Sequence, residues 1–127
     1  MLIVAHGIDV INLPTFEQIA GDVDTDFIER CFTALEKSQF VGAHDQLEHL
    51  AGRFAAKEAI AKALGTGFDG EVSPLNIEIR NQASGVPEVQ LTGGAARAAT
   101  RIGAESWLLS IAHMRPTVIA SAIGLGT

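Results

Sequence analysis

Residues 45–64, DQLEHLAGRFAAKEAIAKAL, carry the longest helical pattern in this chain. Apolar residues recur there at steps of three and four, which predicts one long helix with an apolar face. They are Leu47, Leu50, Ala51, Phe54 and Ala61. Glu58 falls inside the same stripe when each residue advances the helix by about 100°, and Lys62 follows one turn later. A carboxylate facing a core is costly unless a cation meets it.

Two kinds of cation could meet Glu58. A basic residue of the same helix, Lys62 or Arg53, could form a structural ion pair with it. A bound divalent metal would serve equally well. The helix by itself leaves both alternatives open.

Asp9 is a second charged residue in an apolar setting. Residues 2–10, LIVAHGIDV, predict a buried strand whose polar residues are His6 and Asp9, and the sequence shows no evident cationic partner for the aspartate. A lone aspartate at such a place commonly caps a loop. Two carboxylates from separate elements are, however, the usual protein share of a Mg²⁺ site, which phosphate and water complete. Asp9 and Glu58 therefore predict a magnesium site, with Lys62 facing the same phosphate.

The other patterns predict an α+β domain over residues 1–127, in which an antiparallel sheet packs against a long central helix and shorter helices. Short helices are expected at residues 14–20, 27–35 and 95–102. Strands are expected at residues 2–10, 75–79, 88–91, 107–113 and 117–123, the last two as a hairpin.

Composition excludes several classes of function. A formal net charge of -6 argues against nucleic acid as a partner, because phosphate backbones are bound by lysine and arginine. The single cysteine, Cys31, excludes an intrachain disulfide and fits a reducing, cytoplasmic setting. The apolar run at residues 2–5 is too short for a signal peptide or a membrane span. We therefore expect a cytoplasmic protein without membrane association.

Residues 65–70, GTGFDG, match a dinucleotide-binding fingerprint literally but follow a helix, whereas that fold needs them after a strand. Gly65, Thr66 and Gly67 could still let a phosphate approach the backbone, or could simply end the helix. His113 stands beside Arg115 at a strand end, where a phosphate could be held. His6, His44 and His49 are expected to be structural or surface residues.

Two segments together resemble the paired signature of 4′-phosphopantetheinyl transferases, and especially the small holo-acyl-carrier-protein synthases. They are Gly7-Ile8-Asp9-Val10 and Phe54-Ala55-Ala56-Lys57-Glu58-Ala59-Ile60-Ala61-Lys62. Four further segments agree in order and spacing: Leu50-Ala51-Gly52-Arg53, Ala63-Leu64-Gly65-Thr66-Gly67, Ser84-Gly85-Val86-Pro87 and Ser110-Ile111-Ala112-His113. The resemblance extends from the first predicted strand to the last.

The resemblance implies Mg²⁺-dependent transfer of the phosphopantetheine arm of coenzyme A to a serine of an acyl carrier protein, releasing adenosine 3′,5′-bisphosphate for fatty acid biosynthesis. It implies Asp9 and Glu58 as metal ligands and Lys62 near the phosphate. It assigns to the coenzyme A site Arg53, Lys62, Gly65, Thr66, Gly67, Pro87 and His113. The serine proton would leave through Asp9 or a metal-bound water, and these alternatives stay open.

The resemblance also implies a homotrimer with active sites between subunits. If sites are shared, a mixture of an Asp9 variant and a Glu58 variant is expected to regain some activity. Two other functions remain in competition with the transferase: a non-catalytic module that binds coenzyme A or a nucleotide, and a Mg²⁺-dependent phosphohydrolase using Asp9, Glu58 and Lys62.

One part of the sequence departs from the resemblance. The family commonly places a glutamate and then basic residues on the first helix, which receives an acidic carrier. Asn12, Pro14 and Thr15 stand there, and an acidic segment follows with Glu17, Asp22, Asp24 and Asp26. An acidic carrier would be repelled by this segment. Three alternatives stay open: a dock on basic residues such as Arg30, Arg53 and Lys57, an unusual carrier, or a function other than carrier transfer.

Overall fold

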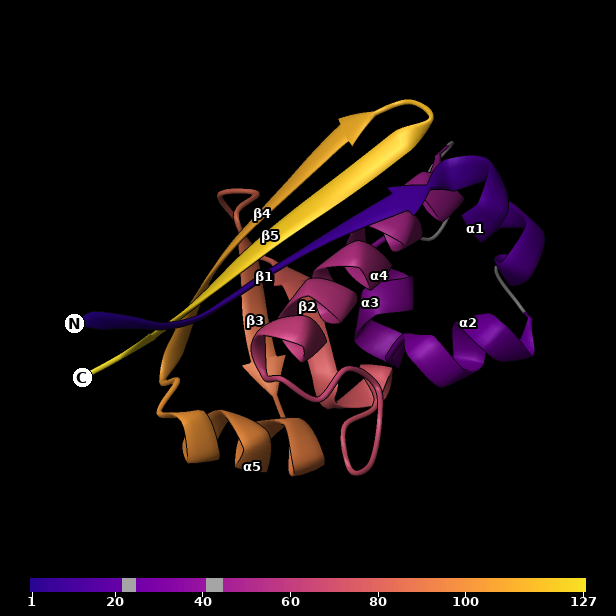
Figure 1. The fold of residues 1–127 in the computed structure, drawn as a ribbon. Coiled ribbons are helices and arrows are strands. Elements are labelled where there is room, and N and C mark those ends of the chain that lie inside the picture. The colour runs from indigo at the N-terminus through magenta and orange to yellow at the C-terminus, as the bar shows by residue number, and fades with distance from the viewer. Residues whose placement is uncertain (22–24, 41–44) are drawn as a thin grey trace.

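A computed structural model describes residues 1–21, 25–40 and 45–127 (Figure 1). Strands β1 (Leu2–Asn12), β4 (Ser106–Met114) and β5 (Thr117–Gly126) form an antiparallel sheet in the order β1-β5-β4. Strands β2 (Ile77–Asn81) and β3 (Pro87–Leu91) form a second antiparallel pair. The long helix α4 (Gln46–Ala63) contacts β1, β4 and β5 of the first sheet and β2 of the second. The predicted α+β class and its long central helix are confirmed.

Helices α1, α2 and α3 each begin at a residue whose side chain caps the helix. In α1 (Leu13–Ala20), Asn12 accepts a hydrogen bond from the Thr15 amide at 3.0 Å. The expected single helix over residues 27–35 is wrong, because α2 (Asp26–Cys31) and α3 (Ala34–Ser38) are separate helices. Thr33 and Glu36 form a capping box that starts α3, and this local hydrogen bonding outweighs the continuous apolar pattern.

Two further short helices follow α4 in the chain. The 3₁₀ turn η1 (Pro74–Asn76) occupies the start of the strand expected at residues 75–79, so that strand begins later than predicted. Helix α5 (Gly93–Ile102) agrees with the predicted alanine-rich helix. In the described residues, none of the helices has both the length and the apolar character needed to cross a membrane.

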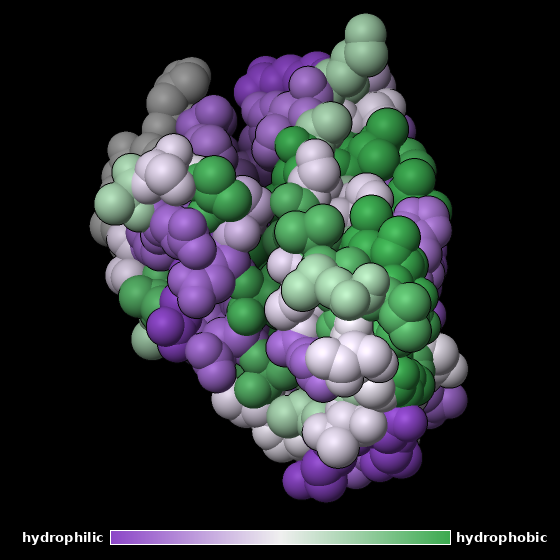
Figure 2. Space-filling model, turned by 90° about the vertical axis from the view of Figure 1, so that its left-hand side faces the viewer, coloured by the Kyte–Doolittle hydropathy of each residue, from purple (hydrophilic) through white to green (hydrophobic). Residues whose placement is uncertain are grey.

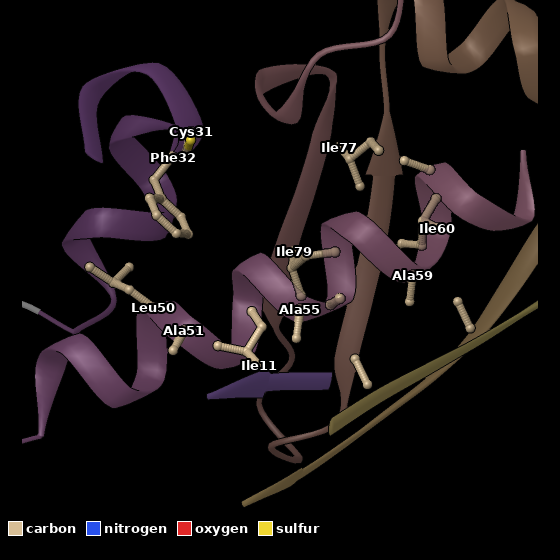
Figure 3. Packing of buried hydrophobic residues seen from close by; sticks show 14 of the residues in the cluster. Ile11, Cys31, Phe32, Leu50, Ala51, Ala55, Ala59, Ile60, Ile77 and Ile79 are labelled. Atoms are coloured by element: carbon tan, nitrogen blue, oxygen red, sulfur yellow. The ribbon is translucent and has the colours of Figure 1, made fainter. Parts of the chain in front are cut away.

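Helix α4 is buried on most of its sides, so the single apolar stripe expected from the sequence was too narrow. Ala55 and Ile60 belong to the same buried cluster as Ile11 of β1 and Ile79 of β2, as Figure 3 illustrates. The small alanine side chains of α4 let the β1-β5-β4 sheet approach this helix closely. At Gly7, an added Cβ would lie only 1.9 Å from the carbonyl oxygen of Ala59. The absence of a side chain at Gly7 therefore allows β1 to pack closely against α4, two residues before Asp9.

Lys57 is the largest departure from the expected surface of α4. Its side chain is fully buried and its Nζ donates hydrogen bonds to Glu36 Oε1 at 2.8 Å, to the Pro74 carbonyl at 2.8 Å and to the Ile77 carbonyl at 2.6 Å. Glu36 in turn accepts from the Ile79 amide at 2.9 Å. Lys57 therefore joins α3, η1 and β2 to the central helix, and the idea that it could dock a partner is wrong.

Replacing Lys57 with methionine is expected to lower the free energy of unfolding by about 3–5 kcal/mol, because Glu36 would keep a buried charge without its cation. Urea unfolding at one fixed protein concentration measures the loss. The matched control is Lys37→Met, which breaks an exposed pair with Glu29 and should cost under about 1 kcal/mol. Equal losses in the two variants would show that the buried network does not stabilise the fold.

Candidate functional site

Asp9 and Lys62 form the first part of the site. Asp9 lies in β1, faces α4 and is only 7% exposed. The Nζ atom of Lys62 lies 2.6 Å from Asp9 Oδ1 and donates a second bond to the Ile8 carbonyl at 3.3 Å. The hydrogen bond to Asp9 raises the pKa of Lys62, so its charge is firmly held. The expectation that Asp9 has no cationic partner is therefore wrong, and Lys62 meets Asp9 rather than Glu58 in the described contacts.

Glu58 completes a pair of carboxyl groups. It is half-buried beside Asp9, and burial, then the Asp9 charge and a hydrogen bond to Asp9, raise the pKa of Glu58 to about 7. Lys62 opposes this shift without cancelling it. Once Glu58 is ionised, the site holds two carboxyl groups against one lysine. An excess of negative charge of this kind is the condition that a divalent cation relieves.

The chemistry of this donor set fits Mg²⁺. Within residues 1–21, 25–40 and 45–127, histidine, cysteine and acidic side chains form no group of three or more that could hold a metal. Asp9 and Glu58 alone offer two hard oxygen donors. The remaining coordination positions of the metal would be left to substrate phosphate and water, as Mg²⁺ prefers. These two residues could hold the metal, and the exposed end of Lys62 lies beside them.

A second pocket gathers three of the residues assigned to coenzyme A. Arg53, Pro87 and His113 line a cavity of about 280 Å³. Arg53 is 7% exposed, donates through Nη2 to Asn81 Oδ1, and its guanidinium lies 5.0 Å from the centre of the Phe40 ring. Among the described atoms its Nε has no hydrogen-bond partner, although it is buried. A buried cation with an unused donor is suited to an anionic group such as a phosphate.

His113 gives this pocket an imidazole ring in addition to the Arg53 guanidinium. Burial lowers the pKa of His113, although Glu48 nearby opposes the shift, and its Nδ1 lies 3.7 Å from Glu48 Oε1. The ring of His49 stacks on Phe40 at 4.6 Å between centroids and provides a flat aromatic wall. The pocket thus combines the Arg53 cation with the planar rings of Phe40, His49 and His113, a combination suited to a phosphorylated nucleotide.

The glycine loop after α4 ends the helix. The amides of Thr66 and Gly67 donate to the Ala61 carbonyl at 3.3 and 3.1 Å, and the amide of Gly65 donates to the Lys62 carbonyl at 3.0 Å. Gly65 and Gly67 have φ values of 82° and 58°, which favour glycine. These three amides are therefore engaged in capping, and the loop adjoins Lys62 rather than the Arg53 pocket.

The residues expected at one site thus lie at two separate places in the folded molecule. Asp9, Glu58 and Lys62 lie where α4 meets β1, whereas Arg53 and His113 line the cavity beside β2. Positions 53 and 58 differ by about 140° around the helix axis, so the two side chains leave α4 in different directions. Asn81 and Phe40 could not be identified from the sequence, because both contribute to the pocket through contacts with Arg53 that form only in the folded chain.

Comparison with known proteins gives consistent matches over nearly the whole chain. The 4′-phosphopantetheinyl transferase superfamily matches residues 5–113. A holo-[acyl-carrier-protein] synthase of Natranaerobius thermophilus is 35% identical over 122 residues, covering 96% of this chain and 97% of the relative. The crystal structure of holo-[acyl-carrier-protein] synthase from Neisseria meningitidis superposes with a TM-score of 0.86 at 34% identity, covering 98% of this chain and 99% of that one.

A further match concerns a structure with a bound ligand. The holo-(acyl-carrier-protein) synthase of Bacillus anthracis, solved in complex with CoA (3′,5′-ADP), has a TM-score of 0.82 and 34% identity, with 100% of both chains covered.

Proposed function

Because the chain belongs to the 4′-phosphopantetheinyl transferase superfamily, we propose that it transfers the 4′-phosphopantetheine group of coenzyme A to a serine of an apo acyl carrier protein. The observation that carries this proposal is the Asp9–Glu58 carboxyl pair, whose excess charge suits a magnesium ion bound to a phosphate. The names of the relatives and the coenzyme A complex of the Bacillus anthracis protein support the substrate.

The chemistry is an attack by the serine oxygen on the phosphorus that carries the pantetheine arm. The new oxygen–phosphorus bond forms as the bond to adenosine 3′,5′-bisphosphate breaks, and the serine proton passes to Asp9 or to a water molecule at the site. Asp9 and Glu58 would hold Mg²⁺, and the metal would supply positive charge to offset the charge of the reacting phosphates. Lys62 is positioned by Asp9 and by the Ile8 carbonyl, and it presents its remaining N–H donor to the same phosphate.

Arg53, Pro87 and His113 bind the adenosine 3′,5′-bisphosphate part of coenzyme A. Arg53 faces the cavity with a cationic group and His113 with an imidazole that can hydrogen-bond to a phosphate, and the rings of Phe40 and His49 also line it. Neither Asp9 nor Glu58 lines this cavity, whose lining residues all lie in the part of the chain that the structure describes. One chain therefore presents two half-sites.

We assign completion of the site to a second copy of the chain in a homotrimer. Exposed apolar side chains on the outer face of the β1-β5-β4 sheet, which alternate with residues facing α4, provide a surface for association; they are Ile8, Val10, Leu108 and Ile119. Figure 2 shows apolar side chains gathered along one side of the molecule. A ring in which the carboxyl half-site of each subunit meets the Arg53 pocket of the next would contain complete sites.

Incubation with coenzyme A, Mg²⁺ and a panel of apo carrier proteins tests the function. We expect a carrier to gain the mass of one phosphopantetheine group, and chelation of the metal to prevent the gain. Release of phosphate or nucleotide without a carrier would identify a phosphohydrolase instead. Binding of coenzyme A with neither reaction would identify a non-catalytic module.

A further inference from the structure

Glu48 joins two basic side chains beside the Arg53 pocket. It lies in the first turn of α4, and its side chain is only 12% exposed. One carboxylate oxygen, Oε2, accepts hydrogen bonds from Arg115 Nε at 2.9 Å and from Arg115 Nη2 at 2.5 Å. The other oxygen, Oε1, lies 3.7 Å from His113 Nδ1. The hydrogen bond from Arg115 lowers the pKa of Glu48, so an ionised carboxylate faces the histidine.

Helix α4 also shapes the place that the His113 ring occupies. Gly52 lies one turn after Glu48, on the same side of the helix. A Cβ added at Gly52 would lie 3.0 Å from His113 Cε1 and 3.2 Å from His113 Nε2. The ring therefore rests against the backbone of α4 with Nδ1 toward Glu48. Because His113 lines the same cavity as Arg53, Nε2 is the ring nitrogen left for a ligand.

The charged and titratable groups that face His113 in the described residues come from α4 and from the turn after β4. They are Asp45, Glu48, His49 and Arg53 of the helix and Arg115 of the turn. Burial lowers the pKa of His113, and Glu48 is the strongest of the charges that oppose this shift. His113 is therefore neutral at about pH 7.5 when no ligand is bound. Position 44, like the acidic positions 22 and 24, lies outside the described residues.

The position of Glu48 decides which nitrogen of the neutral His113 ring carries the hydrogen. A neutral imidazole has one N–H group and one bare nitrogen. An ionised carboxylate can only accept a hydrogen bond, so Glu48 favours the hydrogen on Nδ1 and leaves Nε2 bare. A phosphate dianion is also an acceptor. Nε2 must therefore gain a proton before it can donate a hydrogen bond to a phosphate.

We propose that Glu48 is a positioning residue, which holds the His113 ring from its Nδ1 side so that binding of a phosphate at Nε2 takes up one proton. The proton comes from solvent and joins the ring, and no covalent bond to the phosphate forms or breaks. The imidazolium then lies between two anions, the Glu48 carboxylate and the phosphate. The proposal rests on the proposed function, in which this pocket binds adenosine 3′,5′-bisphosphate.

Calorimetric titration of the metal-free protein with adenosine 3′,5′-bisphosphate, in two buffers of different ionisation enthalpy, measures the proton uptake. At about pH 7.5 a phosphate is almost entirely a dianion, and we expect about one proton to be taken up per bound nucleotide. His113→Gln keeps an N–H donor but cannot titrate, and it should bind without uptake. Uptake that persists in His113→Gln would come from another group, such as Glu58, and would overturn the proposal.

Glu48→Gln removes the charge beside Nδ1 and keeps the length of the side chain. We expect the KM for coenzyme A to rise about tenfold with kcat nearly unchanged, and the proton uptake to fall below about half. The KM should also depend less on pH than in the parent, in which binding weakens as pH rises. The matched control is Glu71→Gln, because Glu71 also holds two arginines but does not line the cavity. Neither quantity should change there.

Arg115→Met separates the positioning of His113 from a purely structural link between α4 and the turn after β4. This variant and Glu48→Gln both break that link, but Arg115→Met keeps the Glu48 charge and should retain most of the proton uptake. Equal losses in the two variants, or full uptake in Glu48→Gln, would give Glu48 a structural role and overturn the proposal. Nucleotide binding without uptake in the parent would overturn the proposal alone, whereas absence of nucleotide binding would overturn the proposed function with it.

Discussion

Asp9→Asn and Glu58→Gln are each expected to lower the rate of carrier modification by at least about 100-fold. Each substitution removes an anionic oxygen donor from the two that the chain offers to Mg²⁺, and with it the stabilisation of charge on the leaving group. The measurement is the mass gain of an apo carrier with time at saturating coenzyme A and Mg²⁺. A variant that keeps more than half of the original rate would remove that residue from the site.

The folded state of these variants is checked by thermal melting without metal. Glu58 has a pKa near 7 in the folded protein and 4.5 as its ordinary value, so its stabilising effect is fully present below about pH 4.5 and is lost as pH rises through about 7. Glu58→Gln cannot ionise and should therefore melt like the parent at about pH 4 and at a higher temperature than the parent at about pH 8. A large drop in melting temperature at both pH values would make Glu58 a structural residue.

The long helix and both carboxylates could be predicted because their signals are local or paired in the sequence. Residues 45–64 have helical periodicity, and α4 occupies nearly the same range. Asp9 and Glu58 were each a charged residue within an apolar pattern, and the structure places the two side by side. The hairpin of β4 and β5 was also apparent, because its strands are adjacent in the chain.

The partners of the lysines could not be predicted, because a helical wheel describes only one helix. Lys57 looked like a surface charge until α3, η1 and β2 enclosed it, and only that packing supplies Glu36 and two carbonyls as its partners. Lys62 lies one turn from Glu58 in sequence, yet its Nζ reaches across to Asp9 on β1. Pairing between elements depends on tertiary contacts that periodicity does not contain.

The separation of the carboxyl pair from the Arg53 pocket also could not be predicted from the sequence. It changes the expectation about mixing Asp9 and Glu58 variants. Since Asp9 and Glu58 lie beside one another in the same chain, a mixture of Asp9 and Glu58 variants cannot restore a complete half-site. Restoration requires variants from opposite halves, one affecting the carboxyl pair and the other affecting the Arg53 pocket.

The central claim, a transferase site completed by a neighbouring subunit, is tested most directly by co-expressing Asp9→Asn with the double variant Arg53→Met/His113→Ala and measuring carrier mass gain. Each variant alone should be almost inactive. Random assembly of a ring should leave about a quarter of the sites with both halves intact, and therefore about a quarter of the original activity. Co-expression of Asp9→Asn with Glu58→Gln is the control and should recover nothing. Activity in the first mixture no greater than that of its components would contradict the shared site.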